Sequence, residues 1–202
     1  MKPQIPITLT LLPPPEDRRG EVEIVEDWAR GLDWVRWLLG SVRARTEHLS
    51  MNGGGWQSFT EGLFPEKIAP ALEAAWTAAH AGDLTALLAA DAALGTKLSS
   101  AENKRSRDAG SILLKSTHKA RYQGVLGHFR DHITAGTAEG HLAIVWAAVG
   151  NFFHLSLANV IAEYLRLEWE IGTRDDLKRR EPNFGLLTRE VLFGRMREPK
   201  VI

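Results

Sequence analysis

The chain has 202 residues, 44% of them hydrophobic and 25% charged, and its 25 Lys and Arg balance 25 Asp and Glu. These values are typical of one globular domain with a sizeable core, and a neutral chain has no overall attraction to nucleic acid or anionic lipid. The absence of cysteine excludes a disulfide framework, a thiolate nucleophile and a cysteine-ligated metal site.

The N-terminal residues predict an extended arm. Apolar side chains alternate along residues 4–12, which is typical of extended chain, and Pro13–Pro15 separate this stretch from the remainder of the chain. We therefore expect residues 1–20 to be extended or disordered and residues 21–202 to form a single all-α domain. Pro6 interrupts the first apolar stretch and no small-residue cleavage site comes after it, unlike a signal peptide, so a cytoplasmic protein is expected.

Two helices are predicted before the middle of the chain. Residues 21–48 have apolar side chains at helical spacing, with acids in the first turns and bases in the last, as the helix dipole favours. The sequence SMNGGG at residues 50–55 then predicts a flexible break. Pro65 is expected to open the next helix, which ends at Gly82, and Pro70 predicts a kink or a later start.

Capping residues mark the next helices in the chain. Asp83 is expected to cap a third helix, and Ser99 and Glu102 form a capping-box pattern that starts a fourth, extending to about Lys119. Residues 121–133 are predicted to be helical, although two glycines weaken that helix.

The uncharged stretch Leu142–Ala162 is the centre of the predicted fold. Its 21 residues include no Asp, Glu, Lys or Arg, and a membrane span needs about 20 apolar residues. Polar residues near its middle favour instead two buried helices, residues 141–153 and 157–169, with Ser156 as N-cap of the second.

The chain after the central pair predicts short helices. One is expected to restart at Thr173, and residues 182–185 should break it before a last helix over residues 186–196. The fold class is therefore all-α: a bundle of about seven to nine helices around a buried apolar helical hairpin, with an extended N-terminal arm.

Three histidines form the candidate metal site. His128 and His132 are four residues apart, which places both imidazoles on one helical face, and His118 would lie near that face on an unbroken helix. Gly124 and Gly127 interrupt this region and no further ligand is evident, so a histidine pair on a solvated basic helix is the favoured interpretation and no cofactor is expected. A transient nickel or zinc site is the alternative. His141 and His154 belong to the apolar pair and are expected to pack in the core.

The region 97–130 carries an excess of Lys and Arg and could contact phosphates of nucleic acid. Residues 16–33 carry an excess of acids. Patches of opposite sign more often meet each other, or a partner protein, so nucleic-acid binding is the weaker alternative.

The seven tryptophans predict mainly packing residues. Trp28, Trp76, Trp146 and Trp169 have the spacing of core residues. Trp56 follows a run of glycines and could anchor a protein interface or pack against its own domain. No phosphate-binding loop, Gly-x-Ser-x-Gly or His-Glu-x-x-His motif is present, so an enzyme is not predicted.

Three segments resemble the UreF-type urease accessory proteins. The sequence GWQSFTEGL at residues 55–63 resembles an early Gly-x-Phe-Ser-x-Ser-x-Gly-Leu-Glu loop of that family. Residues 79–84 and 106–114 are similar to its middle helices, and residues 150–165 to its late helical hairpin ending in Tyr-Leu. The order of the segments matches that of the family.

The resemblance implies a non-catalytic, all-α and dimeric adaptor that binds a second accessory protein and a GTPase and helps deliver nickel to apo-urease. The partner-interface residues implied by position are Trp56, Ser58, Phe59, Thr60, Gly62 and Tyr164. Within the first segment, Gln57 stands in place of an aromatic and Phe64 in place of an acid. The interval from Gly62 to Gly82 is shorter than in the family by about one helix, and no Arg-Leu-x-Pro-Leu-Gly-Gln segment comes after Tyr164.

A second resemblance supports an alternative function. Gly82-Asp83-Leu84, with Asp91 eight residues after Asp83, also looks like the effector-binding domain of GntR-type regulators, which bind metal through histidines. No His follows Asp91 at the expected place. The two leading hypotheses are therefore a protein–protein adaptor and a helical metal- or small-molecule-binding protein.

Overall fold

The computed structural model describes residues 36–45, 55–116, 123–173 and 180–194, and every regular element within these ranges is helical. The all-α prediction is confirmed. The predicted arm and most of the predicted helix over residues 21–48 lie outside the described ranges. The labelled elements are α2 (Gly55–Ser58), η1 (Phe59–Ile68), α3 (Ala69–Ala81), α4 (Leu84–Lys97), α5 (Ser100–Ser116), α6 (Gly124–Thr134), α7 (Leu142–Phe152), α8 (Leu157–Gly172) and α9 (Phe184–Gly194).

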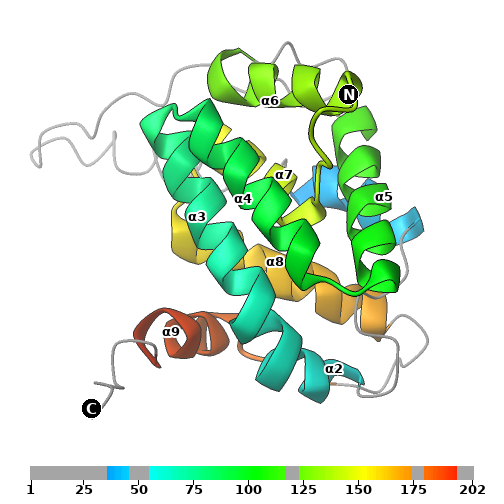
Figure 1. Cartoon of the computed structure of the whole chain (residues 1–202). Coiled ribbons are helices and arrows are strands. Elements are labelled where there is room, and N and C mark those ends of the chain that lie inside the picture. Colours follow the sequence, from blue (N-terminus) through cyan, green and yellow to red (C-terminus); the bar gives the residue numbers. More distant parts are fainter. Residues whose placement is uncertain (1–35, 46–54, 117–122, 174–179, 195–202) are drawn as a thin grey trace, which may run out of the picture.

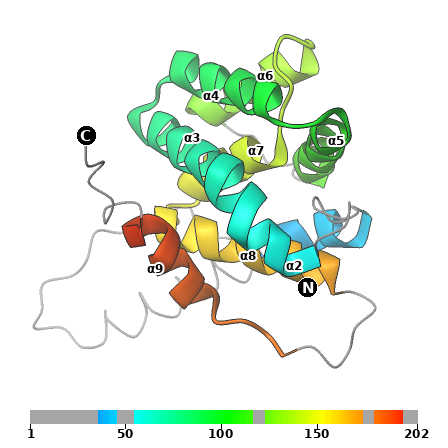
Figure 2. The same cartoon turned by 60° about the horizontal axis from the view of Figure 1, so that its bottom comes forward.

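Helix α7 lies at the centre of the molecule, with α3 and α5 packed most extensively against it (Figure 1). Every residue from Leu142 to Gly150 is buried, so this helix has no solvent-facing side over most of its length. Helix α8 packs beneath it and α9 packs on α8 at the periphery (Figure 2). A helix that is apolar all round is stable in water only when neighbours surround it, which explains the bundle.

The predicted helical hairpin is confirmed as α7 and α8. The Ser156 hydroxyl accepts a hydrogen bond from the Asn159 N–H, as predicted for the N-cap of α8. Close packing joins the two helices, because a Cβ at Gly150 would lie 2.5 Å from Cγ2 of Val160. The indole N–H of Trp146 donates to the Val160 carbonyl at 2.9 Å. No described helix combines the length and apolar content that a bilayer crossing requires.

The predicted caps of α4 and α5 are also found. The Asp83 carboxylate accepts from the Ala86 N–H, and the Ser99 N–H donates to Glu102, whose own N–H points to the Ser99 hydroxyl at 3.4 Å. These contacts satisfy N–H groups that have no partner within their helices. Local sequence therefore fixes where both helices begin.

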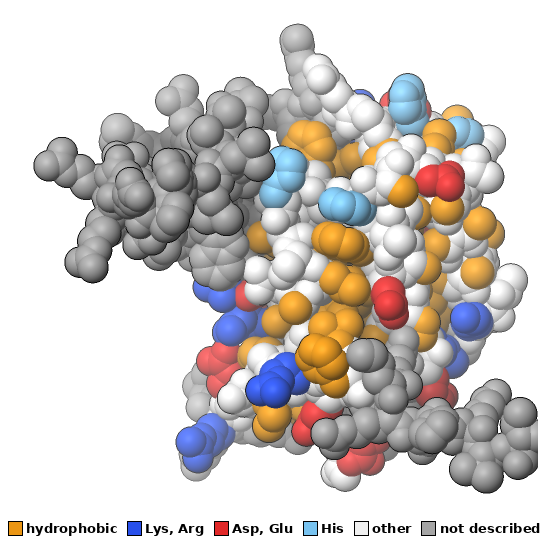
Figure 3. Space-filling model, turned by 90° about the vertical axis from the view of Figure 1, so that its left-hand side faces the viewer, with side chains coloured by type: hydrophobic (Ala, Val, Ile, Leu, Met, Phe, Trp, Pro, Cys, Tyr) orange, Lys and Arg blue, Asp and Glu red, His pale blue; other side chains and the backbone are white. Residues whose placement is uncertain are grey.

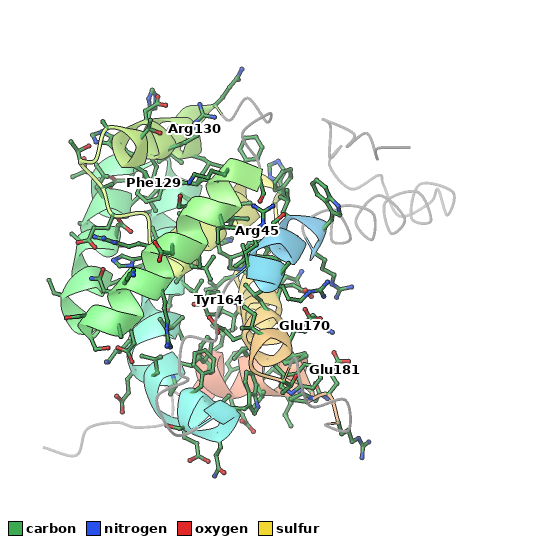
Figure 4. All side chains as sticks on the ribbon, turned by 90° about the vertical axis from the view of Figure 1, so that its right-hand side faces the viewer. Arg45, Phe129, Arg130, Tyr164, Glu170 and Glu181 are labelled. Carbon is green, nitrogen blue, oxygen red and sulfur yellow. The ribbon has the colours of Figure 1, made fainter. Side chains whose placement is uncertain are left out.

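Helical residues 36–45 lie along α8 (Figure 4). Arg36 Nη2 contacts Glu163 Oε1 at 2.8 Å, and Arg43 Nη1 contacts Glu170 Oε2 at 3.1 Å. The two arginines are seven residues apart, and so are the two glutamates that they contact in the same order, so the two helices run in the same direction. The side chains of Leu38 and Val42 are fully buried.

The segment predicted to be a loop, residues 55–63, is instead helical, and Pro65 lies inside a helix rather than at its start. The helical run is continuous from Gly55 to Ala81 and contains a ten-residue π-helix, η1, in which the Ala69 N–H donates to the Phe64 carbonyl. The proline ring would collide with the carbonyl four residues earlier in an α-helix, and the wider π turn relieves that collision. The turn also places Phe59 and Phe64, five residues apart, on the same buried side.

The prediction that His154 packs in the core is wrong, although His141 is fully buried as expected. His154 is exposed and has φ +58° in the turn between α7 and α8, where the Leu155 N–H bonds the Gly150 carbonyl. Glycine normally occupies such a left-handed position after the C-terminus of a helix. The α7–α8 turn requires positive φ here, and a histidine adopts it only with strain.

Replacing His154 with glycine is expected to stabilise the protein by about 0.5–1 kcal/mol, because glycine adopts positive φ without a Cβ collision. Chemical denaturation would measure the change. Ala89→Gly, on the exposed side of α4, is the control and should lower stability by about 1 kcal/mol. Equal destabilisation by both variants would contradict this account of the turn.

Candidate functional site

The segment implied by resemblance to contact partners divides into a buried and an exposed part. The side chains of Phe59 and Tyr164 are fully buried, Ser58 is exposed, and Trp56, Thr60 and Gly62 are half-buried. Phe59 and Tyr164 therefore cannot touch a partner unless the core opens.

The buried part is an aromatic cluster. Ring centroids lie 5.7 Å apart for Trp56 and Phe59, 5.5 Å for Phe59 and Phe64, and 6.2 Å for Phe64 and Tyr164. Phe184 of α9 meets Trp56 edge-on at 6.3 Å. The cluster therefore ties α2 and η1 to α8 and α9, and Trp56 packs against its own domain.

Tyr164 projects from α8 into the interior, whereas Glu170 and Glu181 lie toward the outside (Figure 4). Burial, together with the neighbouring Glu168 carboxylate, raises the pKa of the Tyr164 phenol well above its ordinary value. The phenol is therefore neutral at physiological pH and acts as a packing group of the hairpin.

The exposed part is a shallow hollow on α2 and η1. It has a volume of about 420 Å³ and is lined by Gln57, Ser58, Glu61 and Gly62. The Gln57 amide donates to Glu61 Oε1 at 2.9 Å, and the Thr60 hydroxyl bonds back to the Trp56 and Gln57 carbonyls at 3.1 Å. We call the surface formed by Gln57, Ser58, Glu61 and Gly62 the η1 hollow.

A second polar centre lies at the start of α7. Asp91 of α4 is 1% exposed and accepts three backbone N–H groups, from Glu139 at 2.8 Å and from Gly140 and His141 at 2.9 Å. The Ser106 hydroxyl of α5 lies 3.3 Å from the Leu142 N–H. Two neighbouring helices thus supply the cap that the sequence around α7 lacks.

Sequence reasoning missed the capping role of Asp91, although a signal was present. Asp91 is the one charged residue between Leu84 and Thr96, and a lone acid in an apolar helix is stable only when its oxygens are hydrogen-bonded. Asp83 likewise caps α4. Both aspartates of the regulator-like pattern therefore have structural partners within the fold.

His141 is a buried imidazole beside this centre. Its Nε2 lies 3.3 Å from Glu139 Oε2, and its side chain is fully buried. Burial lowers the pKa of His141 below 6.5, and Arg107 acts in the same direction, while Asp91 and Glu139 oppose the shift. The folded protein therefore favours the neutral imidazole.

This pKa shift predicts that stability falls as the pH falls from about 7.5 to about 5.5, because the unfolded chain binds a proton at His141 more readily than the folded protein does. The His141 contribution is complete above the ordinary pKa and is lost below it. Denaturation midpoints measured across this range should depend less on pH in His141→Gln. His128→Gln, at an exposed position, should retain the full dependence; equal slopes in all three proteins would contradict the assignment.

Two of the three candidate metal ligands lie on the same helix, α6. His128 is exposed on α6, and His132 on the same helix contacts the Thr137 hydroxyl through Nδ1 at 2.8 Å. His118 lies outside the described residues. Among the residues described, no three His, Asp or Glu side chains gather as a metal site would require.

The basic region places Lys97 and Lys104 at exposed positions on α4 and α5. Arg107 contacts Glu139 at 3.6 Å and Arg130 contacts Asp131 at 3.8 Å, so acids neutralise part of this region. Nucleic-acid binding here stays a prediction of the sequence.

Comparison with known proteins identifies a family. The UreF family model matches residues 68–167, which include the Asp91 centre, Ser106, Gly110 and the α7–α8 hairpin but begin after the η1 hollow. No curated protein and no solved structure matches the chain. The matched range covers two of the three segments that resemble the family, and the fold is all-helical as that resemblance implies. The chain therefore belongs to the UreF family of urease accessory proteins.

Proposed function

We propose that this protein is a non-catalytic adaptor of urease maturation, which binds other urease accessory proteins and assists the assembly of the nickel centre without holding a metal itself. The family match over residues 68–167 is the observation that carries the proposal. A cytoplasmic location and a homodimer, both expected from the sequence, belong to the same proposal.

Two features of the described residues support an adaptor. Two buried carboxylates have structural partners within the fold: Asp91 caps α7, and Glu163 binds Arg36 through both carboxylate oxygens at 2.8 and 3.0 Å. The surface offers apolar side chains, since Leu186 and Phe193 on α9 are 53% and 56% exposed and lie two turns apart. Figure 3 shows a band of hydrophobic side chains on the face that carries α3 and α9. Exposed apolar bands often mark protein interfaces.

The test is size-exclusion chromatography with light scattering on the full chain, alone and mixed with the other purified accessory proteins of its urease system. Each sample is run with and without one equivalent of Ni²⁺ or Zn²⁺. We expect a metal-independent dimer that co-elutes with at least one accessory protein. A monomer that binds metal stoichiometrically and elutes alone would overturn the proposal and direct attention to His118, His128 and His132.

A further inference from the structure

We propose that the η1 hollow receives a positively charged helix of another urease accessory protein, with Glu61 pairing a Lys or Arg of that helix and Gly62 permitting its close approach. The inference rests on the adaptor function proposed above and adds to it the location of the contact and the chemistry of the partner.

Gly62 is the first observation. It lies inside the helical run, is outside the left-handed region and is half-buried, yet a Cβ built there would meet no atom of the described residues within 4 Å. Gly110 and Gly150 differ, because a Cβ at either would collide with a neighbouring segment. Glycine weakens helices relative to alanine, so its place at residue 62 has no explanation within the described fold. A partner backbone that packs closely against this position supplies one.

The charge of the hollow specifies the partner. Glu61 is the charged residue among the described residues that line it, and Glu66, five residues later, is also exposed. Because η1 has i→i+5 hydrogen bonds, residues five apart lie near the same face, so the two carboxylates form one acidic edge. The Gln57 amide fixes one Glu61 oxygen, and a carboxylate accepts further hydrogen bonds from Lys or Arg. The surface therefore complements a basic partner.

The shape of the hollow favours a helix over a small ligand. The hollow is open and shallow, and the described residues that line it come from two consecutive turns, whereas small-molecule sites enclose most of their ligand. The π-helix beneath it is held in place by Phe59 and Phe64, whose side chains are buried in the aromatic cluster. The surface is therefore preformed, which reduces the entropy lost on docking. π-Helical turns are rare, and those found within α-helices are frequently at functional sites.

Binding of the full chain to each purified accessory protein, measured by isothermal titration calorimetry, tests the proposal. Glu61→Lys reverses the charge and Gly62→Leu fills the hollow; each should weaken binding to one accessory protein at least about tenfold. Gly62→Ala should weaken it less. Matched controls at exposed positions, Asp108→Lys on α5 and Ala93→Leu on α4, should bind like the unaltered chain. The affinity of the unaltered chain should also fall between about 50 mM and about 300 mM salt.

The outcomes separate the two proposals. If the unaltered chain binds none of the accessory proteins, the adaptor function itself fails. If it binds one of them, and Glu61→Lys and Gly62→Leu bind it equally well, the η1 hollow is not the contact. If these variants change the dimer measured by light scattering but leave partner binding intact, a second copy occupies the hollow and the inference is overturned. Thermal unfolding of each variant checks the fold, and the exposed Glu61→Lys carries the test if Gly62→Leu does not fold.

Discussion

Replacing Gly110 with alanine is expected to destabilise the protein by about 3 kcal/mol or more, a large fraction of the stability of a typical domain. A Cβ at this position would lie 2.0 Å from the Gly140 carbonyl oxygen and 3.1 Å from its carbonyl carbon. Both are backbone atoms, so no side-chain rotation can make room. Helix α5 would have to move away from the chain segment that enters α7, and the buried hydrogen bond near Ser106 would be lost with it.

Urea denaturation of the two proteins would measure this loss. Gly62→Ala is the matched control, because the same methyl group is added within a helix but meets no atom within 4 Å. The control should be neutral or more stable by up to about 1 kcal/mol, since alanine favours helices over glycine. A Gly110→Ala protein with an unchanged midpoint would show that α5 does not approach Gly140 so closely.

Much of the fold could be predicted because the relevant signals are local. Leu142–Ala162 is uncharged, so burial of a helical pair follows from composition, and Ser156 fixes where the second helix begins. Asp83 and the Ser99–Glu102 pair fix other helix starts in the same way. In each case the capping group and the N–H that it bonds are three residues apart, a distance that sequence alone displays.

The π-helix could not be predicted, because apolar periodicity indicates a helix only where its period is 3.6 residues. Phe59 and Phe64 are five apart, and only a wider turn buries both of them. In the sequence Pro65 resembles the first-turn proline of a new helix. In the structure it lies inside a helical run that begins at Gly55, where the helix has the wider π turn. Local sequence rules allow proline both at the start of a helix and at a distorted turn within one, and the packing of the aromatic rings decides between these two structures.

The candidate site could be predicted only in part for a similar reason. The resemblance groups Ser58, Phe59 and Gly62 as one segment, but a helical backbone sends Phe59 inward and leaves Ser58 and Gly62 at the surface. Gln57 and Glu61 line the same hollow and have no signal of their own in the sequence. A sequence motif does not show which of its residues are buried beneath a surface and which are exposed on it.

The Asp91 centre shows why long-range capping escapes prediction, and it gives the second large expected effect. Asp91→Ala should lose about 4 kcal/mol, because it leaves three backbone N–H groups at the start of α7 without the carboxylate that accepts them. Each buried unpaired donor costs about 1–3 kcal/mol, and the N-terminal end of the helix dipole also loses its negative charge. Asp91→Asn should lose less, since one acceptor oxygen remains.

Asp83→Ala is the control, because it removes a helix cap at an exposed position and so measures the stability lost with a cap that water can replace. Asp83 caps α4 with one hydrogen bond, to the Ala86 N–H at 2.9 Å, but it is exposed, so water can replace its carboxylate and the loss should be about 1 kcal/mol. Denaturation of both variants at neutral pH measures the difference, and circular dichroism shows whether Asp91→Ala folds at all. Similar losses at Asp83 and Asp91 would mean that water reaches the start of α7. A much larger loss at Asp91 would show that the central helix of the bundle is held by a carboxylate on a neighbouring helix, about fifty residues away in the sequence.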